Sequence, residues 1–179
     1  FTSCWEAERN YPRMVTIMSK IVLKGGVIID RSGERHADVV IGQDGLISEI
    51  GKNLSAATTI DVKGQIISSG FVDLNAHFSQ PVNEKAETIE TGTRSAVKGG
   101  YTAVIAMPDS EIINDNADTA RSIVKLGETA LCHVEIAGAI TLGNQGKEIA
   151  PLSEMAALGI QHFADPFVAR GNDLTTRRA

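Results

Sequence analysis

Short apolar runs interrupted by glycine occupy residues 20–69. The segments "KIVLKGGVIID", "ADVVIGQDGLISEIG" and "TTIDVKGQIISSG" are rich in β-branched residues and divide into pieces of strand length. Turn signals stand at Gly25-Gly26, Asp44-Gly45 and Lys63-Gly64, and Asp44-Gly45 is the strongest hairpin signal among them. The pattern predicts a small antiparallel β module over residues 19–69, with a loop at 53–59.

The rhythm changes near residue 70, where strand-like runs begin to alternate with longer amphipathic segments. We expect strands at 71–78, 102–107, 134–140 and 161–164, and helices at 87–98, 117–131, 151–158 and from about Asp173. Gly99-Gly100 supplies a stop for the first of these helices. Strands that alternate with helices are typical of βα units in a parallel sheet, so this part of the chain is predicted to be α/β.

Four parallel strands with right-handed crossovers fit either an open doubly wound sheet or half of a (β/α)8 barrel. The glycine-rich phosphate motifs that mark nucleotide-binding open sheets do not occur in the sequence. The candidate site residues described below favour the barrel, with residues 70–179 as its first half and first four strands.

Charge and composition exclude several classes of function. Lys and Arg number 17 against 22 Asp and Glu, and no basic cluster is longer than the "RR" near the end, so no patch would follow a nucleic-acid backbone. No apolar run reaches the ~18 to 20 residues of a membrane span. Cys4 and Cys132 belong to no metal or disulfide pattern. These features predict a cytoplasmic protein with neither nucleic-acid nor membrane partners.

The two ends of the chain have the character of a fragment. The first residue is Phe1 rather than Met, and the last residues fall inside an expected helix. We expect residues 1–18 to be an extra, disordered N-terminal segment, with Met18 as the true start.

The stretch "GFVDLNAHFSQP" carries the candidate chemistry. Alternate side chains of a strand share a face, so those of Asp73, Asn75, His77 and Ser79 should point together into the lumen of a barrel. A His-x-His pair on such a strand would hold a divalent metal, and here Asn75 stands in the first position. His77 is then either a residual metal ligand or a hydrogen-bonded rim histidine.

Two carboxylates are expected at the same rim, because a barrel keeps its active site at the carboxyl ends of its strands. Asp109 follows the second strand in "MPDS", and Asp165 follows the fourth in "FADP". Either could serve the site or simply form a turn beside its proline. The remaining histidines, His36 in a polar loop and His133 and His162 at the starts of strands, are expected to be structural or solvated.

Together these residues and their surroundings resemble the dihydroorotases of the amidohydrolase superfamily over most of residues 20–179. The resemblance is carried by "GFVDLNAHFSQP", "ETIETGTRSAVKGGYTAVIAMPDS" and "GAITLGNQGKEIAPLSEMAALGIQHFAD", and the second segment is closer to dihydroorotases than to hydantoinases or allantoinases. It implies an N-terminal β-sandwich module, a zinc-binding (β/α)8 barrel and reversible hydrolysis of dihydroorotate to carbamoyl-aspartate. It also implies that further metal histidines and the catalytic aspartate lie beyond Ala179, so no catalytic residue is expected within this chain.

The chain departs from the dihydroorotase pattern at the expected rim. His77 matches the second histidine of the family's His-x-His-x-Arg, but Asn75 replaces the first and Ser79 replaces the arginine that holds the substrate carboxylate. Asp109 stands where the family's Pro-Asn-Thr has the asparagine that binds the same carboxylate. Asp165 belongs to "DPF" in place of a family Asp-Asp-Gly that includes a metal ligand. We therefore regard Asn75, Ser79 and Asp109 as degenerate substrate-binding positions, and His77 and Asp165 as residual metal positions.

These departures act in one direction. Loss of the arginine removes a charge-assisted contact worth about 1.5 to 3 kcal/mol. A carboxylate at ~4 Å from an anionic substrate adds repulsion on the order of 4 kcal/mol. Replacement of an imidazole ligand by an amide weakens zinc binding, and with it the activation of water.

Three readings of function remain open. The substitutions cluster while the strand and helix patterns stay intact, so the first reading is a catalytically impaired dihydroorotase-like protein of de novo pyrimidine biosynthesis, with weakened or lost zinc. It would act in an oligomer as a partner of aspartate carbamoyltransferase, as some proteins of this kind do. The second is an active zinc-dependent cyclic amidase that acts on dihydroorotate or on a neutral hydantoin-like ring. The third is a half barrel that does not fold alone, because its edge strands are open.

Overall fold

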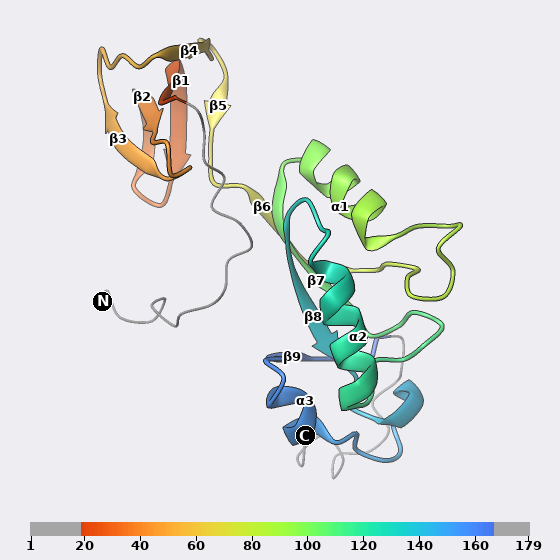
Figure 1. The fold of residues 1–179 in the computed structure, drawn as a ribbon. Helices are drawn as coiled ribbons and strands as arrows, with labels where there is room; N and C mark the ends of the chain where they lie inside the picture. The colour runs from red at the N-terminus through yellow and green to blue at the C-terminus, as the bar shows by residue number, and fades with distance from the viewer. Residues whose placement is uncertain (1–18, 167–179) are drawn as a thin grey trace. The chain divides into compact units, whose positions relative to one another are not determined.

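The computed structural model describes residues 19–166, which form two compact units that meet in sequence between Ser69 and Gly70 (Figure 1). The first unit contains the glycine-interrupted strands, and the second contains the alternating strands and helices. The N-terminal segment 1–18 and the helix expected near Asp173 lie outside the described residues.

The first unit is a single sheet with mixed strand directions. Its strands are β1 (Ile21–Asp30), β2 (Gly33–Ile41), β3 (Ile47–Gly51), β4 (Thr58–Asp61) and β5 (Ile66–Ile67). Antiparallel hairpins join β1 to β2 and β2 to β3, the second of them turning at Asp44-Gly45 as predicted, whereas β4 and β5 pair with β1 in parallel. The connection after β3 is too long for a tight hairpin. It crosses the sheet to the edge of β1 that β2 does not occupy, where β4 and β5 run in the same direction as β1.

Gly25-Gly26 is a bulge inside β1, and the prediction of a turn there is wrong. The register of β1 against β2 shifts between Leu23 and Gly26. Gly25 has a φ of 80°, in the left-handed region that glycine tolerates best. The strand continues through the bulge because Val22 before it and Ile28 after it are both buried, at 0% and 5% exposure.

Asp38 holds this bulge and a later loop together. Its Oδ1 accepts a hydrogen bond from the backbone N–H of Gly25 at 2.8 Å, and its Oδ2 accepts one from the N–H of Leu54 at 3.0 Å. The hydrogen bond from Gly25 is the largest influence on the carboxyl group and, with that from Leu54, holds its pKa below the usual value against the opposing effect of burial.

The second unit confirms the α/β class and the parallel half barrel. Its elements are β6 (Phe71–Ala76), α1 (Ile89–Lys98), β7 (Tyr101–Ala106), α2 (Ala117–Gly127), β8 (His133–Gly138), the short 3₁₀ helix η1 (Leu142–Asn144), α3 (Leu152–Ala156) and β9 (His162–Phe163). The strands lie in the order β6-β7-β8-β9, and every neighbouring pair is parallel. Each strand and helix predicted between residues 70 and 166 is present, with the ends displaced by a few residues where turns take over.

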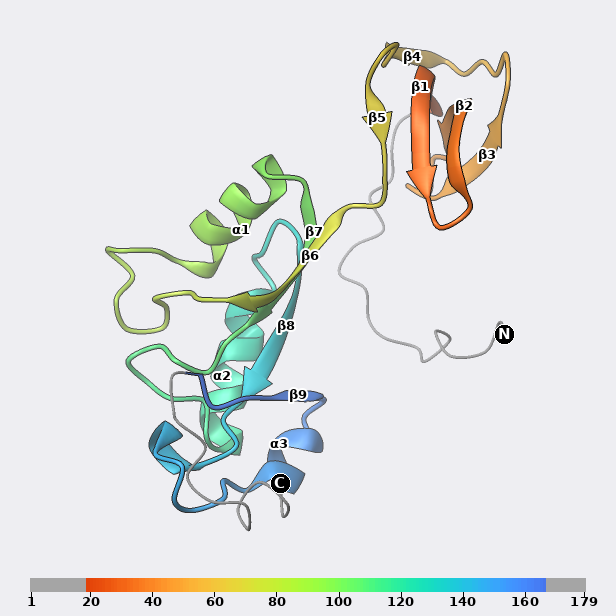
Figure 2. The same ribbon diagram turned by 180° about the vertical axis from the view of Figure 1, so that it is seen from behind.

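Helices cover one face of this sheet. Figure 1 shows α1 and α2 along one side of β6, β7 and β8, and Figure 2 shows the same layers from behind. The core between the layers is made by Ile89, Ala106, Ala120, Ile123, Ile136, Ala150, Met155 and Ile160. In β8, Glu135 precedes the buried Ile136 and therefore points to the uncovered face. None of the helices within residues 19–166 has the length and apolar character needed to cross a membrane.

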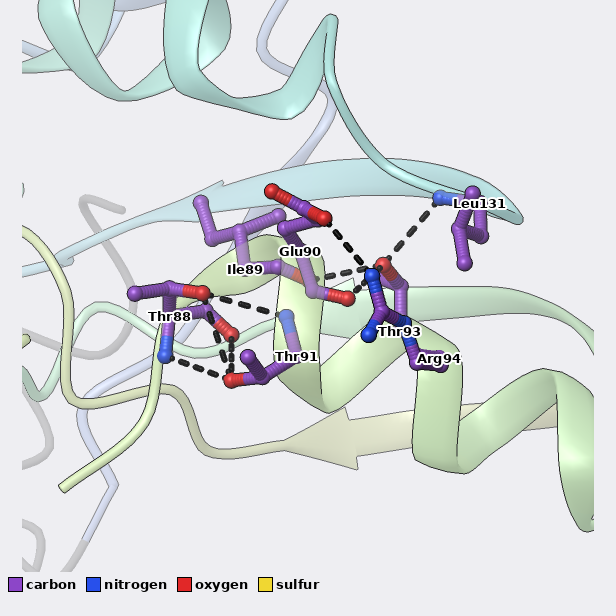
Figure 3. A network of polar contacts seen from close by, with 7 residues as sticks. All are labelled: Thr88, Ile89, Glu90, Thr91, Thr93, Arg94 and Leu131. Carbon is purple, nitrogen blue, oxygen red and sulfur yellow. Dashed lines mark hydrogen bonds and ion pairs between the residues drawn. The ribbon is translucent and has the colours of Figure 1, made fainter.

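Thr93 joins α1 to the chain that enters β8 (Figure 3). Its side chain is fully buried, and its hydroxyl donates to the carbonyl oxygen of Ile89 at 2.7 Å and accepts from the backbone N–H of Leu131 at 3.1 Å. The same helix begins with a capping box, in which Thr88 accepts from the N–H of Thr91 and the Thr91 side chain accepts from the N–H of Thr88. Threonine hydroxyls thus fix both the start of α1 and its contact with the segment that leads into β8.

We predict that Thr93→Val lowers the free energy of unfolding by about 1 to 3 kcal/mol, because the N–H of Leu131 loses its acceptor in a partly buried hydrogen bond and the buried site at Thr93 loses its hydroxyl. Urea denaturation measures this change. Thr93→Ser keeps the hydroxyl and should cost about 0.8 kcal/mol, the value of one methyl group. A loss from Thr93→Val no larger than that from Thr93→Ser would contradict the role assigned to the hydroxyl.

We also predict that Asp38 makes the first unit sensitive to acid. Because its pKa is lower in the folded state than in the unfolded state, its stabilisation is complete above roughly pH 4 and disappears as the pH falls through the folded value. Thermal unfolding of Asp38→Asn, followed from neutral pH into the acid range, should show a lower midpoint at neutral pH and a shallower fall in acid. An acid slope equal to that of the unchanged protein would refute this.

Candidate functional site

The loops after β6 and β7 leave the sheet at the same edge. Ala76, the last residue of β6, pairs with Ala106, the last residue of β7. His77 follows the first of these and Asp109 follows the second within a short loop. Parallel strands bring their carboxyl ends to one edge, so residues far apart in the sequence meet there.

Asn75, His77 and Asp109 form a continuous chain of hydrogen bonds at this edge. The Nδ2 of Asn75 lies 3.0 Å from the Nε2 of His77, and the Nδ1 of His77 lies 2.5 Å from the Oδ2 of Asp109. The His77 side chain is 38% exposed, whereas that of Asp109 is 13% exposed. The structure thus brings together three of the predicted site residues and gives both ring nitrogens of His77 a partner.

The alternation predicted for residues 73–79 is wrong at Asp73, although Asn75 contacts His77 and Ser79 lines the same pocket as His77. The register of β6 against β7 shifts between Asp73 and Ala76, and the strand ends at Ala76. Asp73 Oδ1 instead accepts a hydrogen bond from the backbone N–H of Asn75 at 2.9 Å. Since an irregularity in a strand changes the side to which later residues point, Asp73 does not continue one regular row with His77.

Ser79, His77 and Asp109 line one pocket of about 220 Å³. The rest of its lining consists of Phe78, Asn83, Ser110 and Glu111. Among the described residues that line it, two side chains are carboxylates and none is Lys or Arg. In addition, the Oδ1 of Asp109 is buried with no hydrogen-bond partner among the described residues. The pocket is therefore poorly suited to an anion.

Asp165 serves the loop after β8. Its Oδ1 accepts hydrogen bonds from the backbone N–H groups of Ile140 at 2.8 Å and Thr141 at 3.0 Å, and its Oδ2 accepts one from the Thr141 hydroxyl at 2.5 Å. These hydrogen bonds tie the end of β9 to the end of β8. In the described part of the chain, every hydrogen bond of this carboxylate goes to Ile140 or Thr141, and none joins it to the chain formed by Asn75, His77 and Asp109.

His133 and His162 begin β8 and β9, as the sequence predicted. His36, which was expected in a polar loop, is instead an exposed residue of strand β2, paired with Val27 of β1. His133 Nε2 lies 2.8 Å from Glu135 Oε1, a contact within one strand. Because these two histidines begin their strands, they lie toward the edge opposite His77.

A family model described as dihydro-orotase-like matches residues 64–169 of the chain. The match includes the rim residues Asn75, His77, Asp109 and Asp165 and spans more than half of the sequence. The chain belongs to the dihydroorotase-like family. The resemblance recognised in its rim and strand motifs is thereby confirmed.

Curated dihydroorotases match this dihydroorotase-like chain over most of its length. The dihydroorotase of Solibacter usitatus (strain Ellin6076) is 38% identical over 164 residues, which are 89% of this chain and 38% of that protein. The dihydroorotase of Geobacillus sp. (strain WCH70) is 38% identical over 149 residues, which are 81% of this chain and 35% of that protein. The chain thus spans only about 35 to 38% of the length of these relatives.

Solved structures with the amidohydrolase barrel share the fold. L-hydantoinase (dihydropyrimidinase) from Arthrobacter aurescens superposes with a TM-score of 0.67 at 24% identity, over 82% of this chain and 32% of that one. Dihydropyrimidinase from Brevibacillus agri NCHU1002 gives a TM-score of 0.65 at 23% identity, over 87% and 36%. These likenesses concern the fold and support its assignment as a β module followed by part of a (β/α)8 barrel.

Dihydroorotase-like proteins generally depend on zinc, and the rim residues of this chain do not fit that ion. A protein zinc site uses at least three nitrogen, sulfur or carboxylate ligands. Within residues 19–166, no three His, Cys, Asp or Glu side chains are placed to share a metal. Asn75 supplies an amide where the family pattern has an imidazole, and both nitrogens of His77 already have hydrogen-bond partners.

Two features of the site escaped the sequence reasoning. Glu111 adds a second carboxylate to the pocket. The sequence signal for it was its position directly after "MPDS", in the loop that carries Asp109. Asn144, from η1, donates through Nδ2 to the carbonyl oxygen of Pro108 at 2.8 Å and so braces the loop that carries Asp109. No local pattern could have revealed that contact, because it joins the loop after β7 to the loop after β8.

We predict that Asp165→Ala lowers the free energy of unfolding by about 2 to 3 kcal/mol, because backbone donors and a buried hydroxyl lose a charged acceptor. Urea denaturation at neutral pH checks this value. Asp118→Ala is the matched control, since the Asp118 side chain is 94% exposed in its ion pair with Arg121, and it should change stability by about 0 to 1 kcal/mol. Equal effects of the two substitutions would argue against the assignment.

Proposed function

We propose that this chain is part of a dihydroorotase-like protein of de novo pyrimidine biosynthesis whose own hydrolytic site is impaired, and that it acts as a noncatalytic partner of aspartate carbamoyltransferase. The observation that carries the proposal is the position of His77. Its ring lies between an amide and a carboxylate, at 3.0 and 2.5 Å, where the family pattern would have a second histidine and a metal ion. We infer that zinc binding is weakened or lost at these residues.

The charge of the pocket supports impaired hydrolysis. Dihydroorotate carries a carboxylate, and the pocket beside His77 presents Asp109 and Glu111 to it. A like charge at ~4 Å costs on the order of 4 kcal/mol at an effective dielectric of 20, before screening by salt. Ser79 cannot replace the charge of the arginine that the family pattern has in its position.

The condition of the rest of the fold supports a role that depends on shape. The helix-covered core is filled by apolar residues, α1 retains its capping box, and Asp165 retains its hydrogen bonds to the loop after β8. Substitutions away from the family pattern are gathered at the rim, in Asn75, Ser79 and Asp109. A barrel that keeps its packing but lacks substrate contacts is suited to assembly with another enzyme. The aspartate in "MPDS" also resembles that of noncatalytic members of the family.

The second candidate is an active cyclic amidase that accepts a neutral, hydantoin-like ring. The acidic lining of the pocket favours this candidate over hydrolysis of dihydroorotate, because a neutral ring avoids the repulsion that a carboxylate would meet. Its metal ligands would have to come from residues outside 19–166 together with His77.

Turnover assays separate the two candidates. The full-length protein that contains this chain is supplied with dihydroorotate, carbamoyl-aspartate, hydantoin or allantoin and with zinc, cobalt or manganese, and we expect no rate above background with any of these substrates. The dihydroorotase of Solibacter usitatus serves as the positive control for the dihydroorotate reaction. A metal-dependent rate with hydantoin alone would establish the second candidate, and one with dihydroorotate would overturn both the impairment and the scaffold role.

Association is measured separately, by sedimentation velocity with the aspartate carbamoyltransferase of the same organism. We expect a stable complex that contains both chains. Independent sedimentation of the two proteins at micromolar concentration would remove the proposed partnership while leaving the impaired site in place.

A further inference from the structure

His77 is the residue of the family's metal pattern that this chain keeps, and the hydrogen bonds around it fix where its proton lies. The Nδ2 of Asn75 is an amide nitrogen, which can only donate a hydrogen bond. With the Asn75 amide in its assigned orientation, Nδ2 lies 3.0 Å from the Nε2 of His77, and this ring nitrogen is the acceptor. The ring proton therefore sits on Nδ1, which faces the Oδ2 of Asp109 at 2.5 Å.

We infer that Asp109 is a positioning residue for His77 and holds the imidazole as the neutral Nδ1–H tautomer. The lone pair of Nε2 then faces Asn75 and accepts a hydrogen bond from its amide. A metal ion would need that same lone pair. The inference deepens the proposed impaired site and rests on it. In this arrangement Asp109 accepts a hydrogen bond from the Nδ1–H of the ring. The amide of Asn75 donates to Nε2, the remaining ring nitrogen.

The carboxylate at position 109 is suited to this task in a way that an amide is not. A hydrogen bond to an ionised acceptor is shorter and about twice as strong as one between neutral groups. Asp109 can only accept, so it selects one tautomer, whereas an asparagine could accept from Nδ1–H or donate to a bare Nδ1. Its side chain is 13% exposed, so water competes little for the bond.

The backbone on both sides of the contact is braced. The carbonyl oxygen of Pro108, next to Asp109, accepts a hydrogen bond from Asn144 Nδ2 at 2.8 Å. Phe78, next to His77, packs so closely on α1 that a Cβ at Gly92 would lie 2.3 Å from its Cε1. Both partners are thus held in place by neighbouring elements.

The tautomer can be read directly by long-range ¹H–¹⁵N NMR correlation of the His77 ring in the full chain at neutral pH. We expect the unchanged protein to show protonated Nδ1 and unprotonated Nε2. Asp109→Asn should reduce the preference for that tautomer roughly tenfold. Glu111→Gln removes a charge from the same pocket, keeps the hydrogen bond between His77 and Asp109, and should leave the preference unchanged. Asn75→Ala should also keep the Nδ1–H form, because Asp109 and not Asn75 selects it.

Circular dichroism of each variant confirms folding before the ring is read, and Asn75→Ala provides a second reading if Asp109→Asn does not fold. A ring protonated on Nε2, or on both nitrogens, in the unchanged protein would overturn the inference. So would loss of the Nδ1–H preference in Asn75→Ala, or its full retention in folded Asp109→Asn. Because the readout is the proton position and not turnover or complex formation, failure here is distinguishable from failure of the proposed function.

Discussion

Burial of one face of the parallel sheet beneath its helices is the constraint on which the second unit depends. Ile89, Ile123 and Met155 fill the space between the layers, so the strand residues that face the helices must be apolar. Polar side chains are then confined to the uncovered face and to the loops at the strand ends. Parallel strands direct all their carboxyl ends to one edge, and this is why the loops after β6 and β7 meet.

At this edge, side chains from the loops after β6 and β7 form hydrogen bonds with one another. In a metal-dependent hydrolase the groups at this edge point at an ion and a substrate, whereas here His77 is bonded on one side by Asn75 and on the other by Asp109. The neighbouring pocket has two carboxylates in its lining and no basic residue among those within 19–166. Asn75 and Asp109 therefore contact His77 directly, above a core that is filled by apolar residues.

Particular residues show how far sequence reasoning reaches. Predictions succeeded where neighbours in the chain set the outcome: the Asp44-Gly45 hairpin, the helix that ends before Gly99-Gly100, and the place of Asp109 just beyond its strand. They failed where a distant segment decided. Gly25-Gly26 has the composition of a turn, yet burial of Val22 and Ile28 on either side draws it into a strand as a bulge.

By itself, the sequence determined the kind and order of the elements in the second unit, its parallel half barrel, the family and the departures from the family pattern at the rim, because these are properties of local stretches of chain. Tertiary structure alone decided which groups those rim residues contact. Asp165 and Asp109 follow their strands in similar ways, yet one bonds to the loop after β8 and the other to an imidazole. A side chain's partner depends on which backbone segments the folded layers bring within about 3 Å of it, the reach of a hydrogen bond, and no local pattern encodes that distance.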